Sequence, residues 1–417
     1  MKIIHFSDLH IGVENYGRID PDTGLSTRLN DFLSSFDQVV NFALAEQVDL
    51  VLLAGDVYKG RDPSQTHQRE FAKRLSTLSH NNIPTFILIG NHDLPNTTTR
   101  ANAVEIFPTL DVPNVFVGDK LETHLIKTQS GLLQILSVPW PRRGGILSRE
   151  ESKGMGIDEV RQEIESRITI AIAQQSAGLD PNIPAILTAH ATVNGATVGT
   201  ERSMMLGQDH VLLVSSLQKP QIDYVALGHI HKHQILRNDT PMVVYSGSLE
   251  RVDFSEELDA KGFCVIDIDP DLPQGLRMTD FNFHSVSARP FVSINVEVND
   301  SDLAPNQTIC DSISKINIQD SVVRVKIRVS QEIEHLINDR QIREALNNAH
   351  YIAAITKEIS NTTRPRLTAD IADSLDPMEA VELYLQNRDI DKTHRASITQ
   401  QAQDLMTELE NESASID

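Results

Sequence analysis

Short groups of aspartate, asparagine and histidine recur between residues 8 and 231 of the sequence. They are Asp8-Leu9-His10, Gly55-Asp56, Gly90-Asn91-His92-Asp93, His190 and Gly228-His229-Ile230-His231. Residues two apart in extended backbone point to the same side, so both members of an Asp-x-His or His-x-His pair can face one point. Carboxylate oxygen, imidazole nitrogen and amide carbonyl oxygen form the mixed ligand set expected for Mn, Fe or Zn. The groups therefore predict a centre for two divalent metal ions, in which the Asp56 carboxylate is the natural bridge.

A single one of these groups would indicate little. Gly, Asn and Asp all favour turns, and an isolated His-x-His is more often structural than a metal-binding pair. The set of groups is specific because each member follows a strand-like apolar run. Loops gather at the carboxyl ends of strands in α/β sheets, so residues far apart in the sequence can meet there.

The elements that must position these groups are short strands alternating with amphipathic helices. Strand patterns precede the groups at Lys2–Phe6, Asp49–Ala54, Pro84–Ile89, Pro184–Thr188 and Tyr224–Leu227. Apolar residues fall at helical spacing over residues 29–43 and 65–79. Further strand patterns make the later part strand-rich, at Leu132–Val138, Met242–Tyr245 and Gly262–Ile268. We expect residues 1–286 to form an α/β sandwich of mixed β-sheets flanked by helices.

A different pattern over residues 287–370 predicts a smaller α+β domain. Its strand patterns are Phe291–Val298, Val322–Val329 and Tyr351–Ile359, with a helix after the first and a longer helix after the second. The middle strand carries Arg324, Lys326 and Arg328 at every second position, so all three project from one face. This face could be an ordinary solvated surface or a surface that contacts phosphates.

Residues 371–417 predict an acidic helical tail. Ile398, Ala402, Leu405 and Leu409 lie there at helical spacing. Short helices cannot bury a core by themselves, so the tail must dock either on this chain or on a partner.

Composition bounds the function. The formal net charge of −21 argues against a broadly basic surface for nucleic acid, although bound divalent cations would neutralise part of that charge. Two cysteines are too few for a disulfide framework, and no apolar run is long enough to span a membrane. A soluble cytoplasmic protein is therefore expected.

The order of the metal-binding groups resembles the calcineurin-like metallophosphoesterases. Within them, Phe6–His10 and Ala226–Lys232 resemble the SbcD-type nuclease subunits, and Tyr245–Glu250 with Asp253-Phe254 is similar to their segment after the last metal ligands. The resemblance implies a metal-dependent DNA exo- and endonuclease in double-strand-break repair and recombination, using two divalent ions, Mn²⁺ above all. It also implies action on double-strand ends and hairpins with an SbcC-like ATPase, as a homodimer within a heterotetramer. Residues 287–370 would then be a DNA-binding cap, and residues 371–417 an ATPase-binding segment.

Carried over residue by residue, the resemblance implies two ligand sets that share one aspartate. The first set is Asp8, His10, Asp56 and His231. The second set is Asp56, Asn91, His190 and His229. His92 would stand outside both sets and protonate the leaving oxygen, oriented by Asp93, for which turn capping is the alternative role.

One position departs from the family pattern. Several members carry a histidine three residues after the shared aspartate, where this chain has Lys59. Lysine could face a DNA phosphate, but it does not match the acid–base role of imidazole near neutral pH.

Two other functions remain open on the sequence alone. One is a phosphatase or phosphodiesterase that acts on a small phosphorylated substrate with the same fold. Protein phosphatases of this kind show Gly-Asp-x-x-Asp-Arg-Gly, whereas this chain has Gly-Asp-Val-Tyr-Lys-Gly over residues 55–60. The other is a scaffold for an ATPase, against which the complete ligand set argues.

Overall fold

The computed structural model describes residues 1–95, 100–141, 146–147, 151–199, 211–359, 378, 385 and 392–413. Contacts within the chain form two compact units. The first contains Met1–Ile294, Asn317–Arg324 and Leu346–Ala354; the second contains Asn295–Ile316, Val325–Ala345 and the described residues from Ile355 onward. The boundaries predicted at residues 286 and 370 stay predictions, and much of the predicted tail lies outside the described residues.

Two six-stranded mixed sheets form the first unit, in line with the predicted sandwich. The first sheet has the order β14 (Met278–Ser285), β13 (Gly262–Ile268), β1 (Lys2–Phe6), β2 (Leu50–Leu53), β3 (Thr85–Leu88), β4 (Val115–Gly118). The second has the order β11 (Gln234–Arg237), β12 (Met242–Tyr245), β10 (Tyr224–Gly228), β7 (Ala185–His190), β6 (Gly131–Val138), β5 (Glu122–Thr128). Strands β1 to β4 are parallel, as are β6, β7, β10 and β12, while β5, β11, β13 and β14 pair antiparallel.

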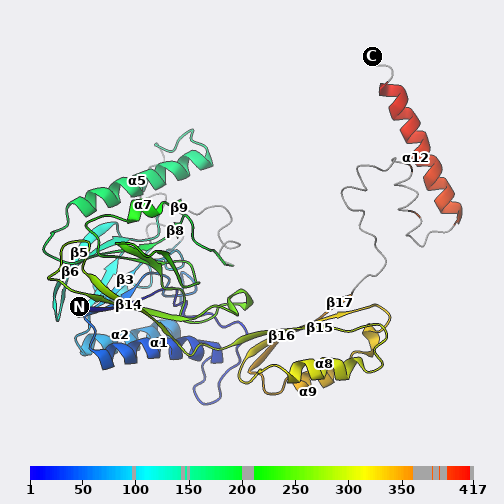
Figure 1. Cartoon of the computed structure of the whole chain (residues 1–417), viewed down its shortest axis with the longest axis horizontal. Coiled ribbons are helices and arrows are strands. Elements are labelled where there is room, and N and C mark those ends of the chain that lie inside the picture. Colours follow the sequence, from blue (N-terminus) through cyan, green and yellow to red (C-terminus); the bar gives the residue numbers. More distant parts are fainter. Residues whose placement is uncertain are drawn as a thin grey trace. The chain divides into compact units, whose positions relative to one another are not determined.

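Apolar side chains between the two sheets form the central core. Alternation along β1 places Ile3 in this core and turns Ile4 and Phe6 to the outer face. Helices α1 (Thr27–Glu46) and α2 (Gln65–His80) cover that outer face, while α5 (Ile157–Ala177) covers the outer face of the second sheet. Figure 1 shows these helices on opposite sides of the sheets. The parallel strands of both sheets are thereby covered on both faces.

His5 belongs to the interior between the sheets. Its Nδ1 accepts a hydrogen bond from the Tyr224 hydroxyl at 3.0 Å, and its Nε2 donates to the Leu227 carbonyl at 3.1 Å. Burial lowers the pKa of His5 to about 3, so the ring is neutral. This histidine therefore joins the two sheets.

The smaller sheet has the order β15 (Phe291–Glu297), β16 (Val322–Val329), β17 (Tyr351–Ile359), and α8 (Pro305–Ser314) follows its first strand. The helix after β16 is not the longer one predicted: α9 covers only Asp339–Ala345. A 3₁₀ turn at Glu334–Leu336 ends in extended backbone at Ile337, so α-helix begins only afterwards. Helix α12 (Lys392–Ser413) provides most of the described part of the predicted helical tail.

The remaining described elements are short. They are α3 (Ile106–Thr109), β8 (Thr192–Val193), β9 (Val211–Leu212), α7 (Val214–Leu217) and a 3₁₀ turn at Phe254–Glu256. Among the described residues, no helix combines the length and the apolar character needed to cross a bilayer.

Candidate metal centre

The predicted ligands converge on one edge of the sandwich. Asp8 and His10 follow β1, Asp56 follows β2 and Asn91 follows β3, all in the first sheet. The second sheet supplies His190 at the end of β7, with His229 and His231 after β10. Their ligand atoms gather into groups within 4.8 Å, among them Asp8–His10–His231 and Asp56–His190–His229.

Two imidazoles approach closely in the first group. The Nε2 atoms of His10 and His231 lie 2.9 Å apart, and Nε2 of His10 is 4.0 Å from Oδ1 of Asp8. Oδ2 of Asp56 lies 3.8 Å from the same His10 nitrogen. The aspartate shared by the two predicted sets thus reaches this group.

Asn91 joins the side chains of the second group. Its Oδ1 lies 3.0 Å from Nε2 of His190 and 3.2 Å from Nδ1 of His229. Oδ2 of Asp56 is 3.3 Å from the same His190 nitrogen. One carboxylate oxygen of Asp56 therefore lies within 4 Å of ring nitrogens from both groups.

Several of these candidate ligands have left-handed backbone, which directs their side chains toward the centre. The φ angles are 53° at Asp8, 46° at His10, 57° at Asp56 and 99° at His229. Such residues cost about 1–3 kcal/mol each and persist only where the surroundings fix them. Here Asp8 N–H donates to the Gly55 carbonyl at 3.0 Å, and His10 N–H donates to the Asp56 carbonyl at 3.1 Å.

Close packing explains why glycine precedes two of the groups. A Cβ atom at Gly90 would lie 2.2 Å from Oδ1 of Asp56, and one at Gly55 would lie 2.2 Å from Nδ1 of His190. Both contacts are shorter than atoms tolerate, so a side chain at either position would displace a candidate ligand.

Asp93 anchors the backbone around Asp56. Its carboxylate accepts N–H groups from Gly90, Asp56 and Val57, each at 3.0 Å. Burial and the neighbouring Asp56 charge raise the pKa of Asp93 to about 7. These hydrogen bonds correspond to the turn-capping alternative for Asp93 and not to the predicted orientation of the His92 ring.

His92 is oriented by a different residue. Its Nδ1 donates to the Lys59 backbone carbonyl at 2.8 Å, and its backbone N–H donates to Oδ1 of Asp56 at 2.8 Å. The half-buried ring lies 5.0 Å from the His10 ring, centroid to centroid. The Lys59 hydrogen bond occupies Nδ1, so any contact with a substrate would use Nε2.

Burial and charge act against each other in the second group. Burial opposes protonation of His190, but the Asp56 carboxylate outweighs it and raises the pKa of His190 to about 9. Burial likewise opposes ionisation of Asp56, yet His190 holds the pKa of this carboxyl well below its usual range. A cation beside Asp56 is therefore favoured, whether it is a proton on His190 or a metal ion.

The donor set fits divalent metal ions. Burial holds the pKa of His10 well below its usual range, so its ring is neutral and can be a ligand. Its Nδ1 is buried without a hydrogen-bond partner among the described residues. Nδ1 of His190 donates to the Ala54 carbonyl at 2.8 Å, which turns Nε2 toward Asn91 and Asp56. Nitrogen and oxygen donors that converge in this way suit Mn, Fe or Zn.

The sequence prediction did not include Glu256 and Lys261, which form a buried ion pair next to His231. Nδ1 of His231 donates to Oε1 of Glu256 at 2.8 Å, and Nζ of Lys261 donates to Oε2 of Glu256 at 2.6 Å. Burial opposes ionisation of Glu256, but His231 and Lys261 outweigh it and hold its pKa well below the usual range. A carboxylate in this position fixes the ring and makes its other nitrogen a better ligand. The nearest residues named in the sequence prediction were Asp253-Phe254, where the similarity to SbcD-type subunits ends.

The predicted DNA-contact residues differ in their surroundings. Arg324 lies with its guanidinium carbon 4.3 Å from the centroid of the Phe254 ring, and its Nε donates to Oγ of Ser293 at 2.7 Å. Lys326 is half-buried and Arg328 is exposed, while the alternating residues Val325 and Ile327 are buried. Lys59 is half-buried beside the centre. Of the basic strand, Lys326 and Arg328 thus remain the better candidates for a ligand surface.

Mixed sheets with carboxylate and histidine clusters at their shared edge define a metallophosphoesterase fold and site. Residues 1–233 match the family model for calcineurin-like phosphoesterases, and the chain belongs to that family. It is 31% identical over 267 residues to the SbcD subunit of the SbcCD nuclease of Rhodobacter capsulatus, covering 60% of this chain and 62% of the relative. The predicted resemblance to SbcD-type proteins is confirmed.

Two further relatives are also named as a nuclease subunit or a DNA repair protein. The SbcD subunit of the SbcCD nuclease of Bacillus subtilis is 26% identical, covering 65% of this chain and 67% of the relative. DNA double-strand break repair protein Mre11 of Archaeoglobus fulgidus is 26% identical, covering 61% and 52%. The chain spans about three fifths of the length of the first relative it matches.

The ion pair behind His231 generates a prediction about metal binding. Glu256→Gln removes the charge that orients His231, so Mn²⁺ affinity in isothermal titration calorimetry should fall about 10- to 100-fold. The matched control is Glu257→Gln, whose carboxylate instead accepts a hydrogen bond from the Ser293 backbone at 2.8 Å. Thermal unfolding by circular dichroism verifies that both variants fold. Equal affinity in wild type and Glu256→Gln would exclude this role.

Proposed function

We propose that this protein is a metal-dependent DNA nuclease that hydrolyses phosphodiester bonds as both exo- and endonuclease. The observation that carries the proposal is the position of Asp56 between two groups of potential metal ligands. Similarity to relatives named as SbcCD nuclease subunits and as a double-strand break repair protein supports DNA as the substrate. We place the reaction in double-strand-break repair and recombination.

We assign two divalent ions, Mn²⁺ by preference, to this centre. The residues for the first are Asp8, His10, Asp56 and His231. The residues for the second are Asp56, Asn91, His190 and His229. When bound, such a pair of ions supplies Lewis-acid stabilisation of the negative charge that develops on the phosphate.

The chain's own side chains complete the reaction. His92 presents Nε2 to the substrate because Lys59 fixes its Nδ1, and it delivers a proton from Nε2 to the leaving oxygen. Asp93 acts as a positioning residue, since it fixes the backbone of Asp56. The Lys59 ammonium adds positive charge near the site and attracts the DNA phosphate.

The proton-transfer role of His92 can be tested directly. His92→Ala should lower the rate of DNA cleavage with Mn²⁺ at least about 100-fold while calorimetry still detects bound Mn²⁺. Substrates are blunt duplex and hairpin DNA, and the matched control is His80→Ala, an exposed histidine at the end of α2. Hydrolysis of para-nitrophenyl phosphate by the wild type, with no action on any DNA, would instead establish the small-substrate alternative.

We also propose that residues 287–370 form a DNA-binding cap. The support is the basic face of β16, where Lys326 and Arg328 alternate with buried valine and isoleucine side chains. Lysine and arginine bound to phosphates release counterions, so DNA affinity depends on salt in proportion to these contacts.

Changing both cap residues tests that assignment. Lys326→Ala with Arg328→Ala should weaken DNA binding and reduce the slope of log affinity against log salt by about 2, as measured by fluorescence anisotropy. Arg340→Ala with Arg343→Ala removes the same charge from the exposed helix α9 and is the control. An unchanged slope in the Lys326→Ala, Arg328→Ala variant would show that this face is an ordinary solvated surface that does not contact DNA.

We further propose an SbcC-like ATPase as partner, with the protein acting as a homodimer within a heterotetramer. The names of the relatives support a multi-subunit nuclease. The apolar residues Ile398 and Leu405 of α12 are both exposed, which suits a helix that docks on a partner.

We also propose that the protein is cytoplasmic. Both of its cysteines are free, which suits a reducing compartment.

The partner assignment predicts the effect of a truncation. Removal of residues 371–417 should abolish co-purification with the ATPase, because the proposed binding helix is lost. Mn²⁺ binding by calorimetry should be unaffected, since the proposed ligands all lie before residue 232. Full retention of the ATPase by the truncated protein would contradict this assignment.

A further inference from the structure

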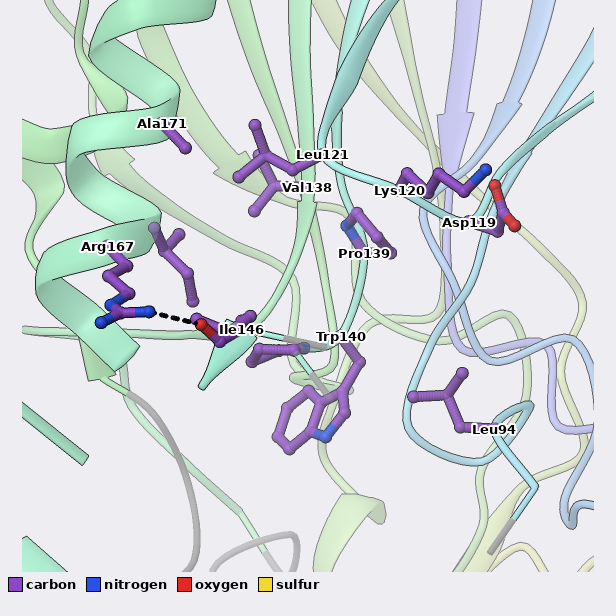
Figure 2. Close-up of a pocket in the computed structure, with 12 residues that line it drawn as sticks. Leu94, Asp119, Lys120, Leu121, Val138, Pro139, Trp140, Ile146, Arg167 and Ala171 are labelled. Carbon is purple, nitrogen blue, oxygen red and sulfur yellow. Dashed lines mark hydrogen bonds between the residues drawn. The ribbon is translucent and has the colours of Figure 1, made fainter. Parts of the chain in front are cut away.

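A mainly apolar cavity of about 390 Å³ adjoins the metal centre. Its walls come from the loop after β3, the end of β6, the loop before β5 and helix α5. The principal apolar side chains are Leu94, Leu121, Val138, Trp140, Ile146 and Ala171. Figure 2 shows them around a common space, with the Trp140 ring at one edge. The volume is typical of a small-molecule pocket.

Trp140 connects this cavity to the candidate ligands. Its ring centroid lies 4.8 Å from that of His229 and 6.1 Å from that of His190. Its backbone N–H donates to the Ile89 carbonyl at 3.0 Å, directly before the Gly90-Asn91-His92 loop. The indole is half-buried, so it borders the centre and the cavity together.

The opposite wall is also held in place. The Arg167 side chain of α5 donates to the Ile146 carbonyl at 2.9 Å, the hydrogen bond dashed in Figure 2. The same guanidinium pairs with Glu163 at 2.7 Å and with Glu151 at 2.9 Å. These contacts hold α5 and Ile146 against each other, so this wall of the cavity is pre-formed.

We propose that this cavity receives one unstacked nucleobase of the DNA strand whose phosphate lies at the metal centre, with Trp140 as the stacking platform. The inference rests on the proposed nuclease function and deepens it. A nucleobase is separated from its phosphate by a single sugar, and the Trp140 ring both contacts the candidate ligand His229 and lines the cavity. Aromatic rings bind bases through their faces, and pockets beside reaction centres accept bases taken out of the stack.

The lining determines which features of the base matter. Apolar walls and one indole offer stacking and dispersion to any base. Of the charged lining residues, Asp119 and Lys120 lie exposed at the rim, and the Arg167 guanidinium is paired with Glu163 and Glu151. The pocket therefore accepts bases with little sequence preference. The requirement to unstack a nucleotide favours DNA ends and single-stranded or hairpin regions, because opening intact duplex costs free energy.

Intrinsic fluorescence can test base binding without any cleavage. Trp140 is the only tryptophan of the chain, so its emission reports this cavity alone. Titration of the full chain in EDTA with a thymidine 12-mer should quench the emission, whereas a 12-mer of abasic deoxyribose phosphates with equal charge should leave it almost unchanged. Equal quenching by both oligonucleotides would overturn the proposal.

Filling the cavity provides a second test. Ala171→Phe places a ring in the cavity from α5, away from the candidate ligands. It should abolish quenching by the thymidine 12-mer and lower the ratio of DNA cleavage to bis(para-nitrophenyl) phosphate hydrolysis by about 10-fold or more. The matched control is Ile170→Phe, at the neighbouring position of the same helix where the side chain is 53% exposed. An unchanged ratio and unchanged quenching in Ala171→Phe would overturn the proposal.

Substitutions of the indole separate stacking from simple packing. Trp140→Phe should retain most DNA cleavage because a ring remains, whereas Trp140→Leu should lower the same ratio as Ala171→Phe does. Equal ratios in the two variants would overturn the stacking role. Failure of the nuclease function has a different signature, namely no DNA cleavage by the wild type, and the fluorescence comparison then still decides whether the cavity binds a base.

Discussion

Backbone hydrogen bonds to the buried Asp93 carboxylate hold together the two loops on which the metal centre depends. The carboxylate accepts N–H groups from Gly90 after β3 and from Asp56 and Val57 after β2. Bonds of this kind satisfy the buried oxygen atoms of Asp93 and fix the donors in one geometry. Asp56 is thereby placed with its carboxylate between His10 of the first sheet and His190 of the second. Fixing this loop helps to hold Asp56 where both groups of candidate ligands can share it.

The centre stores unfavourable free energy that the sandwich offsets. Left-handed φ angles at Asp8, His10, Asp56 and His229 each have a conformational cost, and several ionisable groups lie out of water. The parallel strands beneath them are covered on both faces by apolar side chains. Strain and buried charge gathered at one edge of a well-packed core are typical of a functional site. Divalent ions would compensate the buried carboxylates, which links metal binding to the stability of this edge.

Chemistry and substrate choice use different parts of the chain in the proposed function. The centre at the carboxyl edge suits hydrolysis of any accessible phosphodiester, since its donors recognise metal and phosphate. The Trp140 cavity would favour strands with a base that can leave the stack. The basic face of β16 would contribute affinity through phosphate contacts that carry no sequence information. Such a division suits a nuclease that recognises the form of a DNA end rather than its sequence.

The sequence by itself determined most strands of the two large sheets, the order of the ligand groups and the family, but not the sheet edges β4, β5, β11 and β14. Predicted strands at Lys2–Phe6, Met242–Tyr245 and Gly262–Ile268 coincide with β1, β12 and β13, because apolar runs between turn residues carry a local signal. Helix α5 was not predicted, since only a narrow stripe of residues four apart is buried among charges. Strand β14 was not predicted either, because all of its residues are only partly buried or exposed.

Only the tertiary structure decided how the groups are supported. The Lys59 carbonyl that orients His92, the Glu256 carboxylate behind His231 and the Trp140 ring beside His229 are all distant in sequence from the side chains they contact. Spacing of one or two residues along a strand is fixed by covalent geometry, so motifs can be recognised from sequence. Contacts between separate loops exist only once two sheets have packed and brought their edges together, and no local pattern encodes that approach.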